Sequence, residues 1–160
     1  MEYTTFGKTG RKVSRIGFGG AVAGLKNYLY EYDPESDESI KGVVAAIDKA
    51  LEKGINYFDT APGYGEGRSE KMFGMALEGV DPEQIFLATK VSYGSYDDVM
   101  RSAHQSLKNL RRDQIDLLQI HGDSIGRKRA DDIMGARGML AAMEELKASG
   151  MVKYIGCPSD

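Results

Sequence analysis

The chain has 160 residues, of which 41% are hydrophobic and 28% are charged, as expected for a globular domain with a sizeable core. Its net charge of -3 gives no basic field, so a nucleic-acid partner is not expected. No apolar stretch approaches the roughly 20 residues that span a bilayer, so a membrane partner is not expected either.

The first 14 residues predict a small β-hairpin. The strand-like segments Tyr3–Phe6 and Lys12–Ser14 flank the turn Gly7–Gly10. This segment is polar and lacks the apolar stretch of a secretory signal. The single cysteine, Cys157, cannot form an internal disulfide, and we interpret it as a small buried apolar residue. We therefore expect a cytoplasmic protein.

Strands and helices alternate along the rest of the chain. A first strand is predicted at Ile16–Gly19, and a tyrosine-rich loop follows at residues 27–33. The first helix is predicted to begin at Ser36 or Asp37, both good N-caps, and to end at Gly54. Further strands are predicted at residues 55–58, 85–89, 115–120 and 152–157, and further helices at 69–77, 97–110 and from about 130 to 149.

This order predicts one α/β domain over residues 1–160, with a hairpin at 1–14 and, at 15–160, four βα units and a fifth strand. The repeat of about 30 residues is that of a βαβ unit. Such a parallel sheet either stays open or closes into a barrel, and the repeat alone does not decide between the two. Nothing follows the fifth strand to cover it, so we expect an interrupted sheet that self-associates through its exposed edges.

Three polar residues follow three of these strands at one interval. Asp59 and Lys90 are 31 residues apart, and Lys90 and His121 are separated by the same interval. Because parallel strands point the same way, the three side chains are expected on one rim of the sheet, where α/β barrels carry their chemistry. A catalytic site is the leading interpretation.

Tyr64 lies five residues after Asp59, between two glycines. A phenol is ordinarily too weak an acid to donate a proton efficiently at neutral pH. An ammonium about 4 Å away would stabilise the phenolate by roughly 4 kcal/mol at an effective dielectric near 20. Lys90 could supply that ammonium, Asp59 could hold it, and His121 could bind a carbonyl oxygen. The four residues would then protonate a developing alkoxide, while a redox cofactor supplied the hydride.

Each residue also has a simpler interpretation. A strand-end aspartate often caps a loop, a lysine is usually a solvated charge, and a His-Gly pair can form a turn. For each residue considered alone, the simpler structural interpretation is favoured. For the three residues together, the shared spacing favours a functional site. A hydrolase would need a second carboxylate on the rim or a metal cluster, and the sequence shows neither, so no metal is expected.

The segment Gly54–Ala61, followed by Tyr64, Glu70 and Gly74, closely resembles the signature of aldo-keto reductases. The resemblance extends to Leu87–Lys90, Asp116–His121 and Phe6–Gly10, and so covers essentially the whole chain. It implies a partial (β/α)8 TIM barrel, truncated after strand 5, with the hairpin closing its bottom. It also implies reduction of an aldehyde or ketone by NADPH, with NADH as the alternative. Tyr64 would be the general acid, tuned by Asp59 and Lys90, and His121 would orient the carbonyl substrate.

The resemblance places the cofactor near the turn Gly19, Gly20 and Ala21, beside Asp59. After the fifth strand the family usually has Gly-Val-Ser-Asn, whereas this chain has Gly156-Cys157-Pro158-Ser159. Proline offers no amide N–H, so Ser159 is the residue left to contact the nicotinamide. Because this chain has about half the family's usual length, we expect poor activity from it by itself. A non-catalytic cofactor-binding or regulatory subunit on the same scaffold is the alternative function.

Overall fold

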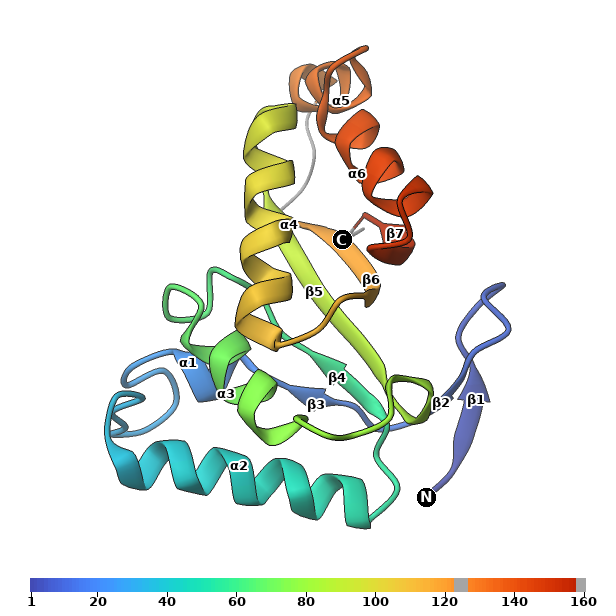
Figure 1. The fold of residues 1–160 in the computed structure, drawn as a ribbon. Coiled ribbons are helices and arrows are strands. Elements are labelled where there is room, and N and C mark those ends of the chain that lie inside the picture. The colour runs from blue at the N-terminus through green and yellow to red at the C-terminus, as the bar shows by residue number, and fades with distance from the viewer. Residues whose placement is uncertain (123–126, 158–160) are drawn as a thin grey trace.

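The computed structural model describes residues 1–122 and 127–157 (Figure 1). Its strands are β1 (Tyr3–Thr5), β2 (Lys12–Ser14), β3 (Phe18–Gly19), β4 (Tyr57–Asp59), β5 (Phe86–Ser92), β6 (Ile115–His121) and β7 (Val152–Gly156). Its helices are α1 (Ala21–Gly24), α2 (Asp37–Glu52), α3 (Arg68–Ala76), α4 (Tyr96–Leu110), α5 (Arg127–Met134) and α6 (Met139–Ala148), and a short 3-10 helix, η1, spans Pro82–Gln84.

The larger sheet is parallel throughout and follows chain order, β3-β4-β5-β6-β7. Each connection therefore moves one strand in the same direction. Because such crossovers are right-handed, winding in one direction places the connecting helices on one face of the sheet. A doubly wound fold would reverse direction and cover both faces. The sheet therefore has the strand order and the winding direction of an α/β barrel, and it contains five strands.

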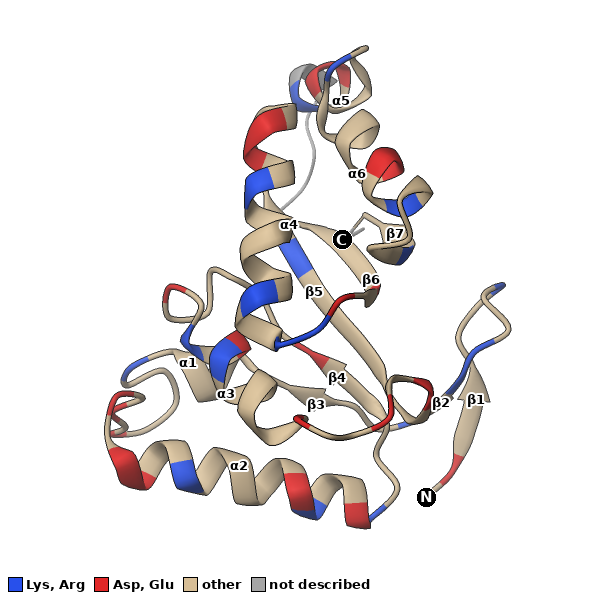
Figure 2. Ribbon diagram, in the orientation of Figure 1, with Lys and Arg blue, Asp and Glu red and all other residues tan. Residues whose placement is uncertain are grey.

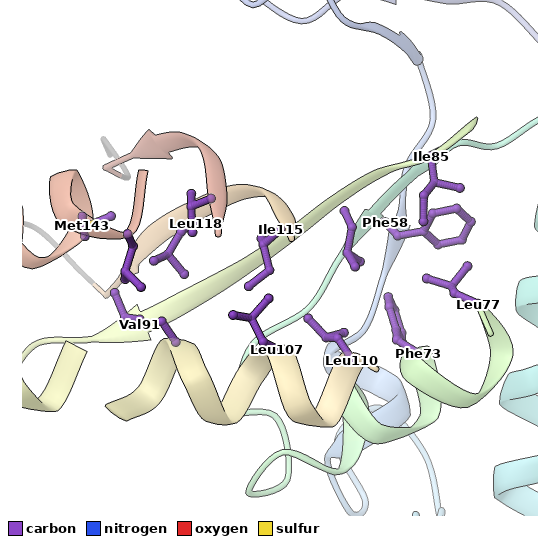
Figure 3. Close-up of a cluster of buried hydrophobic side chains, with 14 of the residues drawn as sticks. Phe58, Phe73, Leu77, Ile85, Val91, Leu107, Leu110, Ile115, Leu118 and Met143 are labelled. Atoms are coloured by element: carbon purple, nitrogen blue, oxygen red, sulfur yellow. The ribbon is translucent and has the colours of Figure 1, made fainter. Parts of the chain in front are cut away.

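The main core lies between the sheet and these helices. Figure 3 shows Leu107 and Leu110 of α4, and Phe73 of α3, directed toward Phe58 and Ile115 of the strands. All five side chains are at most 8% exposed. The predicted starts of α2 and α4 are close to the observed ones because each has a polar cap. Ser36 accepts a hydrogen bond from the Ser39 amide, and Ser95 caps α4.

A smaller core on the opposite face joins the hairpin to the first residues of the strands. Val13 packs with Phe86, Ala88 and Leu117, and the partly buried rings of Phe6, Tyr57 and Tyr154 surround them. The side chain of Asn56 fastens the hairpin, since its Oδ1 accepts from the Ser14 amide at 2.6 Å and its Nδ2 donates to the Lys12 carbonyl at 2.9 Å. The hairpin therefore covers the amino ends of the strands and leaves their carboxyl ends open.

A charged cluster ties the same hairpin to the sheet. Arg11 contacts Glu83 at 2.6 Å, and Lys153 of β7 contacts Glu83 at 2.8 Å and the buried Asp116 at 3.2 Å. The hydrogen bond from Lys153 is the main cause that lowers the pKa of Glu83. Burial opposes the charge of Lys153, but its bonds to Glu83 and Asp116 raise its pKa overall.

Several local predictions were wrong. The predicted fourth helix is two helices, because the chain turns at Gly138, where an added Cβ would lie 2.3 Å from the Asp132 carbonyl oxygen. Helix α5 occupies part of the loop predicted at 122–130, and the short α1 was not predicted. Strand β5 continues two residues past Lys90, since Ser92 still pairs with His121.

Cys157, expected to be buried, is exposed. It directly follows β7, an outer strand of the described sheet, and borders an apolar hollow of about 350 Å³ beside α5 and α6. Among the described residues, no helix combines the length and apolar character needed to cross a bilayer.

The charged cluster predicts an acid-dependent loss of stability. Since the folded pKa of Glu83 is lowered, its contribution is fully present above the ordinary carboxyl pKa, near 4.3, and is lost as the pH falls through the lower folded value. Thermal unfolding of Glu83→Gln should therefore differ most from wild type near neutral pH, and the difference should shrink in acid. Glu78→Gln, at an exposed pair with Arg111, is the matched control. A difference independent of pH would contradict this assignment.

Candidate active site

The strand register explains why the 31-residue interval places three side chains on one face. Asp59 pairs with Ala88, and Lys90 pairs with Gln119. Lys90 is therefore two residues beyond the partner of Asp59, and His121 is two residues beyond the partner of Lys90. Because side chains alternate along a strand, an offset of two keeps the same face. Paired residues on neighbouring strands are thus 29 positions apart in sequence. Each site residue lies two positions beyond the partner of the previous one, which gives the 31-residue interval.

Asp59 and Lys90 are the only charged residues of β4 and β5, which are otherwise tan in Figure 2. The side chain of Asp59 is 28% exposed and that of Lys90 is 15% exposed. Lys90 Nζ lies 2.5 Å from Asp59 Oδ1, so the two charges form an ion pair. Such a partly buried ammonium needs a partner for its charge and its donors, and Asp59 provides one.

The ammonium of Lys90 has two more acceptors. It donates to the backbone carbonyl of Thr60 at 2.9 Å and to Tyr64 Oη at 3.4 Å. An ammonium has three N–H donors, and these three acceptors account for all of them. Since the phenol oxygen accepts from Lys90, the phenol's own proton is available for another acceptor.

His121 completes the group at the end of β6. Its ring meets that of Tyr64 edge to face, with centroids 5.5 Å apart and planes at 88°. Lys90 Nζ also lies 5.0 Å from the centroid of the Tyr64 ring. The structure thus brings together the four predicted residues, Asp59, Tyr64, Lys90 and His121, within one hydrogen-bonded and ring-contacting group.

The predicted cofactor residues divide into two sets. Gly19 ends β3, pairs with Asp59 and is exposed, and a Cβ added to it would meet no atom within 4 Å. The amide of Gly20 donates to the Asp59 carbonyl at 2.7 Å, and Ala21 begins α1. This turn therefore lies beside the acidic member of the site and leaves open space above Gly19. Ser159 lies outside the described residues.

The loop that carries Tyr64 is held by close backbone contacts. A Cβ on Gly24 of α1 would lie 2.2 Å from the Tyr64 carbonyl oxygen, and one on Gly65 would lie 1.9 Å from the Gly24 carbonyl oxygen. Gly65 also has φ +68°, which favours glycine. The two glycines therefore let α1 and the loop approach closely, and this approach positions Tyr64.

Sequence reasoning missed two supporting groups. The carbonyl of Thr60 accepts from Lys90, but every residue has a carbonyl, so no sequence signal could identify it. Ser69 Oγ is buried, lies 2.8 Å from Thr60 Oγ1, and donates to the Gly20 carbonyl at 2.8 Å. Its polar type at the start of a helix was a usable signal, but a helix cap was the more common explanation.

Comparison with known proteins matches residues 15–159 to the aldo/keto reductase family. An L-galactose dehydrogenase of Arabidopsis thaliana is 30% identical over 98% of this chain and 48% of its own length. The holo form of an aldo-keto reductase of Bacillus halodurans is 31% identical, with a TM-score of 0.75 over 99% of this chain and 50% of its own. An aldo-keto reductase of Klebsiella pneumoniae solved with NADPH is 25% identical, with a TM-score of 0.75 over 100% of this chain and 51% of its own. The chain thus spans about half the length of these relatives.

The close approach at Gly24 predicts a measurable cost. Gly24→Ala would force its Cβ against the Tyr64 carbonyl, so we expect a loss of roughly 1–3 kcal/mol in unfolding free energy, as for other overpacked sites. Gly42→Ala is the matched control, since it lies within α2 with no atom within 4 Å of an added Cβ. That change should stabilise the chain by about 0.5–1 kcal/mol. Chemical denaturation measures both, and equal effects would contradict the proposed packing role of Gly24.

Proposed function

The chain belongs to the aldo/keto reductase family, and on that premise we propose that it reduces aldehydes or ketones to alcohols with NADPH. One observation carries the proposal: the Lys90 ammonium is hydrogen-bonded to Tyr64 and Asp59 together. That arrangement suits proton donation to an oxygen that becomes negatively charged. Because the chain spans about half the length of its relatives, the activity is proposed for the protein of which these residues are a part.

Tyr64 is the proposed general acid. As the carbonyl carbon is reduced, its oxygen develops the charge of an alkoxide and takes the phenol proton from Tyr64. The O–H bond of Tyr64 breaks, an O–H bond forms on the product, and a phenolate remains. The ammonium of Lys90, 3.4 Å from that oxygen, stabilises the phenolate by direct attraction. Asp59 holds the ammonium in place through the 2.5 Å ion pair.

His121 is proposed to orient the substrate. Its edge-to-face contact with Tyr64 places the imidazole beside the phenol. An added Cβ at Gly63 would lie 3.5 Å from His121 Cε1, so the loop that carries Tyr64 runs close to the imidazole at this glycine. A neutral imidazole N–H can donate to the carbonyl oxygen that Tyr64 protonates. Two donors on one oxygen would fix the direction of the carbonyl group.

The residues present suit part of a nicotinamide site. NADPH, when bound, would supply the hydride. The turn at Gly19, Gly20 and Ala21 has open space above Gly19, its exposed residue, and is bonded to the backbone of Asp59. We assign this turn and Asp59 to the wall against which the cofactor lies, and Ser159 to the contact with its carboxamide. NADH is the alternative donor.

Removal of the phenol oxygen tests the acid. Tyr64→Phe should lower kcat by about 10² to 10⁴, the usual contribution of a general acid, with little change in NADPH affinity. NADPH oxidation with a simple aldehyde, followed by absorbance, measures the rate. Tyr3→Phe is the matched control, because Tyr3 bonds to the Gly54 carbonyl in the region of the hairpin. Normal turnover by Tyr64→Phe would rule out this mechanism.

A substitution at Gly19 tests the cofactor wall. Since an added Cβ meets nothing there and the φ of Gly19 is not positive, Gly19→Leu should fold normally while filling the space above the turn. We expect NADPH binding, measured by nucleotide fluorescence, to weaken at least about tenfold, which corresponds to 1.4 kcal/mol. Ala148→Leu, at an exposed position at the end of α6, is the control.

Unchanged NADPH affinity in Gly19→Leu would remove the turn from the cofactor site. A parallel titration with NADH decides between the two donors. Saturable binding of either nucleotide without turnover of any carbonyl would instead support the alternative of a non-catalytic cofactor-binding subunit.

A further inference from the structure

Glu70 is a completely buried carboxylate that the proposed reaction does not use. It lies in the first turn of α3 and has an exposed fraction of 0%. Each of its oxygens has one donor: Thr89 Oγ1 donates to Oε1 at 2.7 Å, and Asn109 Nδ2 donates to Oε2 at 2.9 Å. A buried carboxylate costs free energy unless it is paired in this way, so its presence calls for a reason.

The two donors come from two different elements, β5 and α4. Thr89 precedes Lys90 in β5, and Asn109 lies near the end of α4. Gln105 donates to Asn109 Oδ1 at 2.9 Å, which orients the Asn109 amide with its nitrogen toward Glu70. A chain of hydrogen bonds thus runs from the surface of α4 to the residue next to Lys90.

The same turn of α3 also holds the loop that carries Tyr64. The Ser69 amide donates to the Tyr64 carbonyl at 3.2 Å, and Ser69 directly precedes Glu70. Asn109 packs against the end of that loop, since an added Cβ on Gly67 would lie 2.7 Å from Asn109 Nδ2. Glu70 therefore links the Tyr64 loop, through one side chain, to the strand that carries Lys90.

We propose that Glu70 is a positioning residue that sets the separation of Tyr64 Oη and Lys90 Nζ through its hydrogen bonds to Thr89 and Asn109. Only the expected effect of Glu70 on turnover rests on the proposed function, whereas its effect on the position of Tyr64 does not. The 3.4 Å contact is long for a hydrogen bond, so a small relative movement of β5 and the loop would break it. Glu70 acts through Thr89 and the loop, since its own side-chain hydrogen bonds go to Thr89 and Asn109.

The substitution Glu70→Gln keeps the shape of the side chain and changes its hydrogen bonding. An amide has one acceptor oxygen where the carboxylate has two. Its nitrogen would face either Asn109 Nδ2, where two donors oppose each other, or Thr89 Oγ1, where the direction of the bond reverses. Thr89→Val removes the hydroxyl that donates to Glu70 Oε1, whereas Thr89→Ser retains a hydroxyl there. Glu78→Gln, at an exposed glutamate just after α3, is the matched control.

The test uses the full chain labelled with 3-fluorotyrosine, and the Tyr64 resonance is assigned by its loss in Tyr64→Phe. Glu70→Gln and Thr89→Val should shift or split this ¹⁹F resonance, while Thr89→Ser and Glu78→Gln should leave it in place. In an assay of the whole protein with NADPH and an aldehyde, Glu70→Gln and Thr89→Val should lower kcat roughly 10-fold to 100-fold, the usual effect of misplacing a catalytic group. The KM for the aldehyde should stay within about twofold of wild type.

An unmoved Tyr64 resonance in folded Glu70→Gln would overturn the positioning role, and so would equal effects of Thr89→Val and Thr89→Ser. If circular dichroism shows that Glu70→Gln does not fold, Thr89→Val decides. Asn109→Ala gives a milder variant because this residue is only partly buried, and it should shift the resonance in the same direction. If the whole protein, of which these residues are a part, reduces no carbonyl, the proposed function fails while the resonance still tests the positioning of Tyr64.

Discussion

The ammonium of Lys90 is the interaction on which the candidate site depends. Its three donors reach the carboxylate of Asp59, the carbonyl of Thr60 and the phenol of Tyr64. These acceptors come from the end of β4 and the loop that follows it, so the ammonium joins β5 to both. A charge that is only 15% exposed is stable there because it is paired and its donors are used. The same pairing leaves the proton of Tyr64 free for donation.

The fold keeps this polar group separate from the apolar cores. Helices α2, α3, α4 and α6 pack on one face of the sheet and bury the side chains that point toward them. On the opposite face, the hairpin and the rings around Phe86 cover the amino ends of the strands. Polar side chains on that face are therefore accommodated toward the carboxyl ends, where Asp59, Lys90 and His121 lie. The buried Glu70, on the helix side of β5, connects the two layers through Thr89.

The sequence predicted the strongly patterned elements well. Helix α2 has both an apolar repeat and the Ser36 cap, and β4 and β6 end at Asp59 and His121 as expected. It failed where local pattern is weak. Helix α1 is four residues long, and the break between α5 and α6 depends on the packing of Gly138 against the backbone of α5. The exposure of Cys157 depends on what lies next to β7, which no local pattern encodes.

By itself the sequence determined the α/β order, the one-face placement of Asp59, Lys90 and His121, and the family, because strand periodicity and a signature motif are local properties. Only the tertiary structure decided the distances and the partners. The Thr60 carbonyl, the approach of Gly24 to the Tyr64 loop, and the link from Glu70 to Thr89 join residues between 19 and 40 positions apart in sequence, or involve backbone atoms that every residue shares. Such contacts are set by how the layers pack, and packing is a property of the whole fold.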